Sequence, residues 1–256
     1  MEIFDTHAHY DDTAFDADRD MLLGETLPAA GVCGIVSCGT NIKSSKANAG
    51  LAAKYKYLYF AAGIHPEDAE GYEDGDIDRL TELIKGSEKA VAVGEIGLDY
   101  HWEIDRTLQK TLLERQLDLA RTLNLPVILH DRDAHGDMLD ILHTHKPCGV
   151  MHCFSGSAES AEELVALGFY IGFTGSVTFK NNKKAARVVE AVPIERIVVE
   201  TDCPYMAPEP LRGKRSDSAM IVRTLDFIAG VRGIATEELA RITASNARSL
   251  FNIKPV

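Results

Sequence analysis

Short apolar runs alternate with segments of helical pattern along the whole 256-residue sequence. The runs are apolar throughout, as is typical of parallel strands that are buried on both faces. We expect strands at residues 2–6, 32–37, 58–64, 90–94, 127–129, 149–151, 169–174 and 197–200. Eight strand–helix units in a chain of this length predict an α/β fold, a (β/α)8 TIM barrel formed by a single domain over residues 1–256.

Helical patterns fill the segments between these runs. Leucines and an alanine recur at helical spacing from Leu108 to Leu123 and predict an amphipathic helix. Gly168 is the kind of residue favoured just past a helix end. The other helices are expected at residues 19–30, 44–54, 78–85, 134–145, 158–167 and 183–192, with further helices over 217–251. Residues 67–76 are expected to form a solvated loop.

A histidine or an acidic residue stands at the end of six of the apolar runs. These residues are His7 and His9, His65, Glu95, His130, His152 and Asp202. In such barrels the C-terminal strand ends open on one face, which carries the active site. His7 and His9 are two residues apart, so on a strand both project to the same side. Polar alternation on a half-exposed strand also gives this spacing, but its recurrence predicts one ring of polar side chains.

Four histidines and two carboxylates on one rim suit divalent metal ions. The candidate ligands are His7, His9, Glu95, His130, His152 and Asp202. Six ligands exceed the number that a tetrahedral zinc site uses, so we expect two ions, which could be Mg²⁺, Mn²⁺ or Zn²⁺. Two adjacent ions suit hydrolysis by an activated water. Glu95 is placed to bridge them, and Asp202 to hold a metal and accept a proton from the water.

The bulk composition narrows the class of protein. The net charge of −12 argues against a protein that coats nucleic acid, since such proteins are usually basic, but it leaves a nucleic-acid substrate open. Five cysteines without a Cys-x-x-Cys spacing indicate core residues in a reducing compartment. No leader pattern and no apolar run of membrane-spanning length occurs. We therefore expect a cytoplasmic protein with no membrane contact and no obligate protein partner.

Several motifs form a specific set that extends over nearly the whole chain. They are Phe4-Asp-Thr-His-Ala-His9, Gly63-Ile-His-Pro66, Gly94-Glu-Ile-Gly-Leu-Asp-Tyr100, His130-Asp-Arg132, His152-Cys-Phe-Ser-Gly156, Glu200-Thr-Asp-Cys-Pro-Tyr205, Arg212-Gly-Lys-Arg215 and Asn246-Ala-Arg-Ser-Leu-Phe251. This set resembles the TatD family of metal-dependent deoxyribonucleases, within the amidohydrolase-like metal barrels. The resemblance implies the same six metal ligands, DNA as substrate, and cleavage of its phosphodiesters from an end in the 3′–5′ direction. Many barrels of this superfamily carry a carbamylated lysine where this chain has Glu95, which points to the nuclease branch.

Five further residues are candidates for substrate binding. His65 on the rim is expected to contact a phosphate, with a hydrogen-bonded loop histidine as the alternative. Arg132 follows a ligand and can grip a phosphate through paired hydrogen bonds, with a surface ion pair as the alternative. Arg212, Lys214 and Arg215 form a basic loop after the eighth strand, placed to meet a polyanion.

The surrounding loops carry features with open interpretations. Lys180, Lys183 and Lys184 form a second basic cluster after the seventh strand, and a solvated helix start is the commoner role for one. Tyr100 and Trp102 either stack on a base or pack as a lid on the rim. Family members usually have Asn and, two residues on, proline where this chain has Ser216-Asp217-Ser218. We expect that departure to change the substrate loop and to leave the metals untouched.

Two other functions use the same features differently. A small-molecule amidohydrolase or lactonase would need a narrow, capped pocket in place of an open groove with basic rims. A non-catalytic scaffold would keep the metals for stability and expose an apolar patch on the outer wall. The complete ligand set favours an enzyme, a metal-dependent phosphodiester hydrolase.

Overall fold

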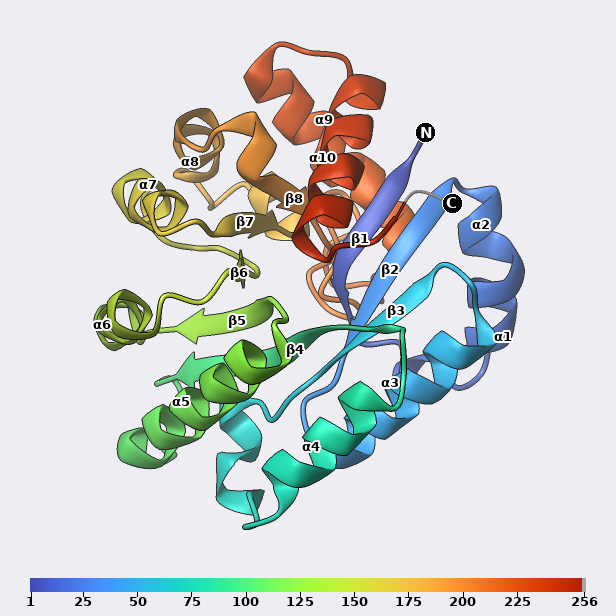
Figure 1. Ribbon diagram of the computed structural model, residues 1–256. Coiled ribbons are helices and arrows are strands. Elements are labelled where there is room, and N and C mark those ends of the chain that lie inside the picture. The colour runs from blue at the N-terminus through green and yellow to red at the C-terminus, as the bar shows by residue number, and fades with distance from the viewer. Residues whose placement is uncertain (255–256) are drawn as a thin grey trace.

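The computed structural model describes residues 1–254, and the last two residues of the domain predicted over 1–256 lie outside this range. Within the described residues, eight parallel strands form one sheet in chain order. They are β1 (Ile3–Ala8), β2 (Val32–Cys38), β3 (Leu58–Ala62), β4 (Ala90–Asp99), β5 (Val127–Arg132), β6 (Gly149–Met151), β7 (Tyr170–Phe173) and β8 (Ile197–Val199). Figure 1 shows them inside a layer of helices. The predicted (β/α)8 barrel is confirmed.

Helices cover the outside of the barrel and one of its ends. They are α1 (Arg19–Met21), α2 (Leu27–Ala29), α3 (Ile42–Lys54), α4 (Asp76–Lys85), α5 (Arg106–Leu123), α6 (His135–His145), α7 (Ala158–Ala166), α8 (Ala185–Ala191), α9 (Ile221–Arg232) and α10 (Thr236–Leu250). Helix α10 lies against β1 in Figure 1, and its Ala247, with Phe251 just beyond it, packs with Phe4 and Val198 of the strands. This packing leaves the opposite end of the barrel, where the strands finish, for the polar side chains.

The end of β1 is hydrogen-bonded to the residues that follow β8. The amide of Asp202 donates to the carbonyl of His7, and the amide of His9 donates to the carbonyl of Cys203. Asp5 in β1 strengthens this closure, because its carboxyl accepts hydrogen bonds from the Thr201 amide at 3.0 Å and the Thr201 hydroxyl at 2.7 Å. The candidate ligands His7 and Asp202, which are far apart in the sequence, are thereby held side by side.

The fourth strand is longer than predicted. It was expected to end at residue 94 but continues to Asp99, because Ile96 and Leu98 are buried and pair with β5. Gly97 permits this approach, since it has a φ of 153° and a Cβ there would lie 2.0 Å from the carbonyl oxygen of His130. Glu95 therefore lies inside a strand, which holds it more firmly than a loop would.

The fifth strand, expected at 127–129, also continues to Arg132 and includes His130. Three further segments differ from the sequence expectation. The helix expected at 19–30 is interrupted by a π-helical turn, Leu22–Thr26, and the proline at position 28 has no N–H to continue an α-helical ladder. The helix expected at 183–192 is shorter, Ala185–Ala191, and follows a turn. Residues 67–76 are not simply a solvated loop, since they include most of the 3₁₀ helix Pro66–Gly71 and Ala69 is buried.

Candidate metal centre at the barrel mouth

Glu95 occupies the centre of the site, and its side chain is only 5% exposed. Its Oε2 atom is 3.3 Å from Nε2 of His7 and 3.5 Å from Nε2 of His9. These two imidazole nitrogens are 3.0 Å apart. Asp202 completes this first group, because its Oδ1 atom is 3.6 Å from Nε2 of His7 and 3.3 Å from Nε2 of His9.

The other oxygen of Glu95 faces a second group of histidines. Its Oε1 atom is 2.9 Å from Nε2 of His152 and 3.1 Å from Nδ1 of His130. Nε2 of His65 is 3.5 Å away from the same oxygen. The structure thus brings together all six residues predicted as ligands. It also places His65, predicted as a phosphate contact, directly against the central carboxylate.

The backbone and neighbouring groups decide which nitrogen of each ring faces the centre. Nδ1 of His9 is 3.0 Å from the carbonyl oxygen of Cys38, so it donates there and Nε2 is the nitrogen that faces the centre. Nε2 of His130 is 3.0 Å from Oδ2 of Asp99, so this ring turns Nδ1 toward the centre. Asp202 has a φ of 58°, a left-handed conformation that is uncommon for a non-glycine residue and frequent at functional sites.

In the metal-free protein the carboxylates and histidines of the site shift the pKa values of Glu95, His9 and His130 toward their charged forms. Burial opposes ionisation of Glu95, but the neighbouring histidines, His152 first, outweigh it and hold the pKa of Glu95 well below its usual value. Burial also disfavours a charged His9, but Asp202 and Glu95 raise its pKa to about 9. Hydrogen bonds to carboxylates likewise overcome burial and raise the pKa of His130 to about 9. The carboxylates are therefore ionised at neutral pH and able to bind a cation.

Sequence reasoning missed two carboxylates that support the ligands. Asp99 is only 1% exposed and orients His130, as described above. Glu200 is fully buried, with its Oε1 atom 3.5 Å from Nδ1 of His152 and accepting from the amide of Cys153 at 2.5 Å. Asp99 and Glu200 both belong to the motifs that identified the ligands. A carboxylate within an apolar run was the feature of the sequence that could have indicated their role. Outer-shell carboxylates of this kind commonly fix the orientation of metal-binding histidines.

A third buried carboxylate, Asp5, connects the site to the segment that departs from the family pattern. Its Oδ1 atom accepts from the amide of His7 at 3.2 Å, and its Oδ2 atom accepts from the hydroxyl of Ser218 at 2.7 Å. Burial raises the pKa of Asp5 to about 7. Ser218 also hydrogen-bonds Tyr10 at 2.7 Å. The departure at Ser216-Asp217-Ser218 therefore reaches the strand that carries His7, closer to the metal ligands than expected.

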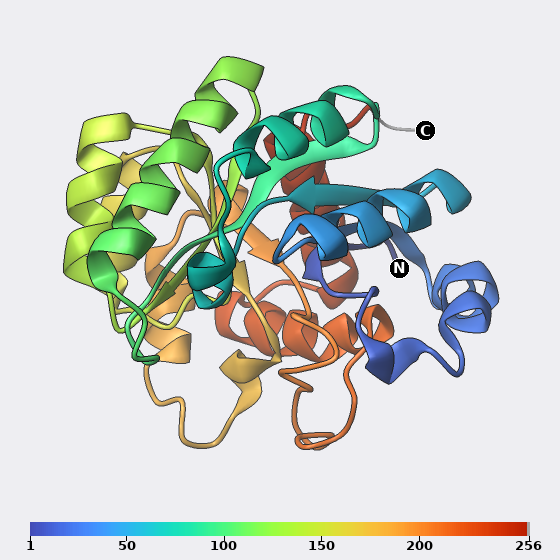
Figure 2. The ribbon, with the colours of Figure 1, turned by 90° about the horizontal axis from the view of Figure 1, so that it is seen from below.

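A cavity of about 750 Å³ opens above these residues. Its wall includes His9, Glu95, His130, His152 and Asp202, which places the centre on its floor. The loops around it follow the C-terminal ends of the strands, and three of them project from the lower side of the molecule in Figure 2. The predicted mouth is therefore a real cavity that is large enough for a small organic ligand.

The predicted substrate residues occupy different surroundings. Arg132 lines the cavity, and its guanidinium is 4.0 Å from Asp99. Arg212 lies over the ring of Phe179, 4.3 Å from its centroid, and Lys214 is exposed on the same loop. The guanidinium of Arg215 instead makes two hydrogen bonds to Asp18, at 2.7 and 2.6 Å.

Trp102 lies at the edge of the mouth, and its indole N–H donates to Glu67 at 2.5 Å. This bond connects the loop after β4 to the loop after β3, as a lid packed on the rim would.

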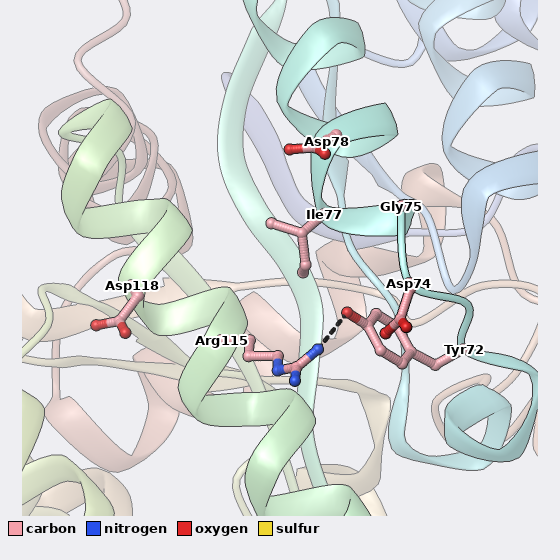
Figure 3. Close-up of a pocket in the computed structure, with 7 residues that line it drawn as sticks. All are labelled: Tyr72, Asp74, Gly75, Ile77, Asp78, Arg115 and Asp118. Carbon is pink, nitrogen blue, oxygen red and sulfur yellow. Dashed lines mark hydrogen bonds between the residues drawn. The ribbon is translucent and has the colours of Figure 1, made fainter.

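A different pocket of about 350 Å³ lies between α4 and α5, where Arg115 donates to the Tyr72 hydroxyl at 2.7 Å (Figure 3). Its lining shares no residue with the cavity at the mouth.

The donor set itself fits divalent metal ions. Imidazole nitrogens and carboxylate oxygens converge within groups whose ligand atoms all lie within 4.8 Å of one another. Nε2 of His7, His9 and His152 and Nδ1 of His130 all face Glu95, and imidazole together with carboxylate is a ligand set that divalent metal ions accept. An α/β barrel with such a group of ligands at its mouth defines the class of metal-dependent barrel hydrolases.

Comparison with known proteins places the chain within that class. Residues 4–252 match the family model described as TatD related DNase, and the chain belongs to this family of metal-dependent hydrolases. It is 40% identical to the uncharacterized metal-dependent hydrolase YabD of Bacillus subtilis, with 98% of this chain and 99% of YabD covered. It is 34% identical to the 3′-5′ ssDNA/RNA exonuclease TatD of Salmonella typhimurium, with 98% and 99% covered. The solved structure of the TatD homologue YjjV from Escherichia coli superposes with a TM-score of 0.91 at 33% identity, with 98% of each chain covered.

No helix within residues 1–254 combines the length and apolar character that crossing a membrane requires.

Proposed function

We propose that this protein is a two-metal nuclease that shortens DNA from an end in the 3′–5′ direction. The observation that carries the proposal is the position of Glu95, each of whose oxygens faces its own group of histidines. This arrangement suits a carboxylate that bridges two ions. A relative that is 34% identical is named as a 3′-5′ ssDNA/RNA exonuclease, which supports the choice of substrate.

The residues divide into two sets of ligands around the bridging Glu95. His7, His9 and Asp202 would hold one ion through Nε2, Nε2 and Oδ1. His130 and His152 would hold the second, and the position of His65 allows it to join them. Bound divalent ions lower the pKa of a water and stabilise charge that develops on a phosphate.

Asp202 would accept a proton during hydrolysis. Its carboxylate lies beside the first group of ligands and also lines the cavity, so it reaches both the ligands and the space for substrate. Nearby histidines keep its pKa below the usual value despite the opposing effect of burial, so it is ionised and ready to take a proton. Arg132 is placed at the cavity wall to bind a phosphate oxygen.

The predicted substrate loop keeps its role in this proposal. Arg212 and Lys214 are exposed beside the mouth and would contact the nucleic acid. Arg215 would contribute less, because its guanidinium is already paired with Asp18. We also infer that the protein works in the cytoplasm, since its five cysteines are free thiols, as suits a reducing compartment.

The test is degradation of end-labelled single-stranded DNA by protein stripped of metal with a chelator. Mg²⁺, Mn²⁺ or Zn²⁺ is then added back to the parent, to His130→Ala and to His143→Ala. His143 is a matched control, because it lies on α6 and pairs with Glu163 outside the metal centre. We expect stepwise shortening from the 3′ end by the parent and the control, and its loss in His130→Ala.

Two results would contradict the proposal. One is a folded His130→Ala variant that shortens DNA as fast as the parent. The other is absence of cleavage with every metal although the ions bind, which would favour a small-molecule hydrolase. Esters, lactones and amides would then be the substrates to examine on the same metal-loaded protein.

A further inference from the structure

The mouth of the barrel is divided by charge. On the side formed by the loops after β1 and β3, four carboxylates line the cavity, and we call them the acidic wall. They are Asp11, Asp12, Glu67 and Asp68. Their hydrogen-bond donors are neutral, for example Ser44 on Asp11 at 2.6 Å. No lysine or arginine within residues 1–254 forms an ion pair with any of the four.

Another part of the rim is formed by two loops that follow β7 and β8, and Tyr205 on the second of them borders Asp12 of the acidic wall. Phe179, Tyr205 and Met206 line the cavity there, and the Tyr205 and Met206 side chains are among the large exposed hydrophobic ones. The two loops pack closely, since a Cβ on Gly175 would lie 2.1 Å from the carbonyl oxygen of Met206. In addition, the amide of Glu209 donates to the Thr178 hydroxyl at 2.8 Å. In Figure 2 they project together from the lower side, coloured gold and orange. They therefore form one surface, which we call the loop pair.

The loop pair carries most of the exposed cations near the mouth, in addition to Arg132 in the cavity wall. Lys180, Lys183 and Lys184 directly follow Phe179 and are exposed, and no ion pair engages them in the described part of the chain. Arg212 lies over the Phe179 ring. Lys183 and Lys184 stand at the exposed start of α8, with Lys184 as its N-cap, so the solvated helix start considered for these lysines is compatible with a role in binding.

This proposal rests on the proposed nuclease function and adds the path of its substrate. We propose that single-stranded nucleic acid crosses the mouth over the loop pair, with its terminal base against Phe179 and Tyr205 and its phosphates along Lys180, Lys183 and Lys184. Aromatic rings beside a cationic track are the features that bind a single strand without regard to sequence. The acidic wall repels phosphates, which favours a path along the lysines over a path across the wall.

The contact of the strand's phosphates with Lys180, Lys183 and Lys184, which we call the track, is tested by the salt dependence of binding. Anisotropy of a 20-nucleotide fluorescent single strand is measured over a range of salt concentrations with the metal-loaded parent and with the triple variant Lys180→Ala, Lys183→Ala, Lys184→Ala. Each phosphate contact contributes about 0.7 to the slope of log affinity against log salt, so the triple variant should lower the slope by about 2. The matched control is Lys43→Ala, Lys46→Ala, Lys85→Ala, which removes equal charge from exposed positions on α3 and α4.

Stacking on the aromatic side is tested at the exposed Tyr205. Tyr205→Ala is expected to weaken binding roughly tenfold, while Tyr205→Phe keeps the ring and should retain the parent affinity. Equal loss in both variants would overturn the stacking role, because only the hydroxyl is missing from the second.

The two proposals fail in different ways. Shortening of the labelled strand is followed in the same samples. If the parent shortens DNA but the triple variant keeps the parent's slope, or the control loses as much, the track is wrong and the nuclease function stands. If the parent binds the strand along the track but never shortens it, the nuclease function is wrong and the track stands. A parent that does not bind the strand overturns the track.

Discussion

The carboxylate of Asp99 offers the sharpest test of how the second group of ligands is held. It accepts from Nε2 of His130 at 3.0 Å through Oδ2 and from the amide of His101 at 2.9 Å through Oδ1. An asparagine has the same shape but only one acceptor oxygen. In Asp99→Asn one of these two hydrogen bonds must therefore break, or an N–H must face another N–H.

The expected size of the effect follows from these contacts. Burial opposes the charge of Asp99, but the hydrogen bond from His130 outweighs it and keeps its pKa below the usual value, so a charge-assisted bond is lost. Loss of an outer-shell partner typically costs about 10- to 100-fold in metal affinity or activity, which is about 1.4 to 2.7 kcal/mol. Asp99→Ala removes both bonds and should lie at the upper end of that range.

Metal affinity is measured by competition with a chromogenic chelator, alongside the thermal transition of the metal-free protein. Asp137→Asn is the matched control, because Asp137 also accepts from a neighbour, the Tyr100 hydroxyl at 2.5 Å, but contacts no candidate ligand. The control should bind metal as the parent does. Unchanged affinity in a folded Asp99→Asn variant would refute the orienting role.

Three further predictions concern protons and packing. Because the pKa values of His9 and His130 in the metal-free protein are about 9, both imidazoles are in their positively charged, doubly protonated form at pH 7.5. Metal binding should release one proton from each. Calorimetry in buffers of different ionisation enthalpy measures this release, which should fade above pH 9; a buffer-independent enthalpy at pH 7.5 would contradict it. Gly172→Ala should cost about 1–3 kcal/mol in urea unfolding, because its Cβ would lie 2.5 Å from the buried Glu200 carboxylate. Gly50→Ala lies at an exposed position of α3, where a Cβ meets no atom within 4 Å, and should instead stabilise by about 1 kcal/mol. A loss there would show the helix to be more constrained than the structure indicates.

The predicted ligands could be found from the sequence because each stands at or near the C-terminal end of an apolar run, although His7, Glu95 and His130 prove to lie inside their strands. In a parallel barrel those places converge whatever the details of packing, so His7 and His152 could be placed together without coordinates. Glu95 was also found, but for a partly wrong reason, since its strand continues beyond it to Asp99. The short apolar run before it did not show that Gly97 allows the chain to pass so close to β5.

The supporting residues were harder to predict because their roles depend on pairs distant in the sequence. Asp5 and Ser218 meet only after the barrel closes, and no local pattern indicates that contact. The same holds for Arg215, which belongs to a basic motif yet lies in an ion pair with Asp18. Charge clusters in a sequence do not show which members are already paired. The division of the mouth into an acidic wall and a cationic loop pair emerges only from the fold.

The closure of β1 against the end of β8 also has a consequence for folding during synthesis of the chain. His7 and His9 are synthesised long before Thr201 and Asp202, which hold them in place. Contacts over such a span form late in folding, because a long loop must close before they form. A truncated product that stops before β8 would keep both histidines and lack the closing partner. We therefore expect chains that include β8 and the residues after it to bind metal tightly, and chains that stop before β8 to lack tight binding.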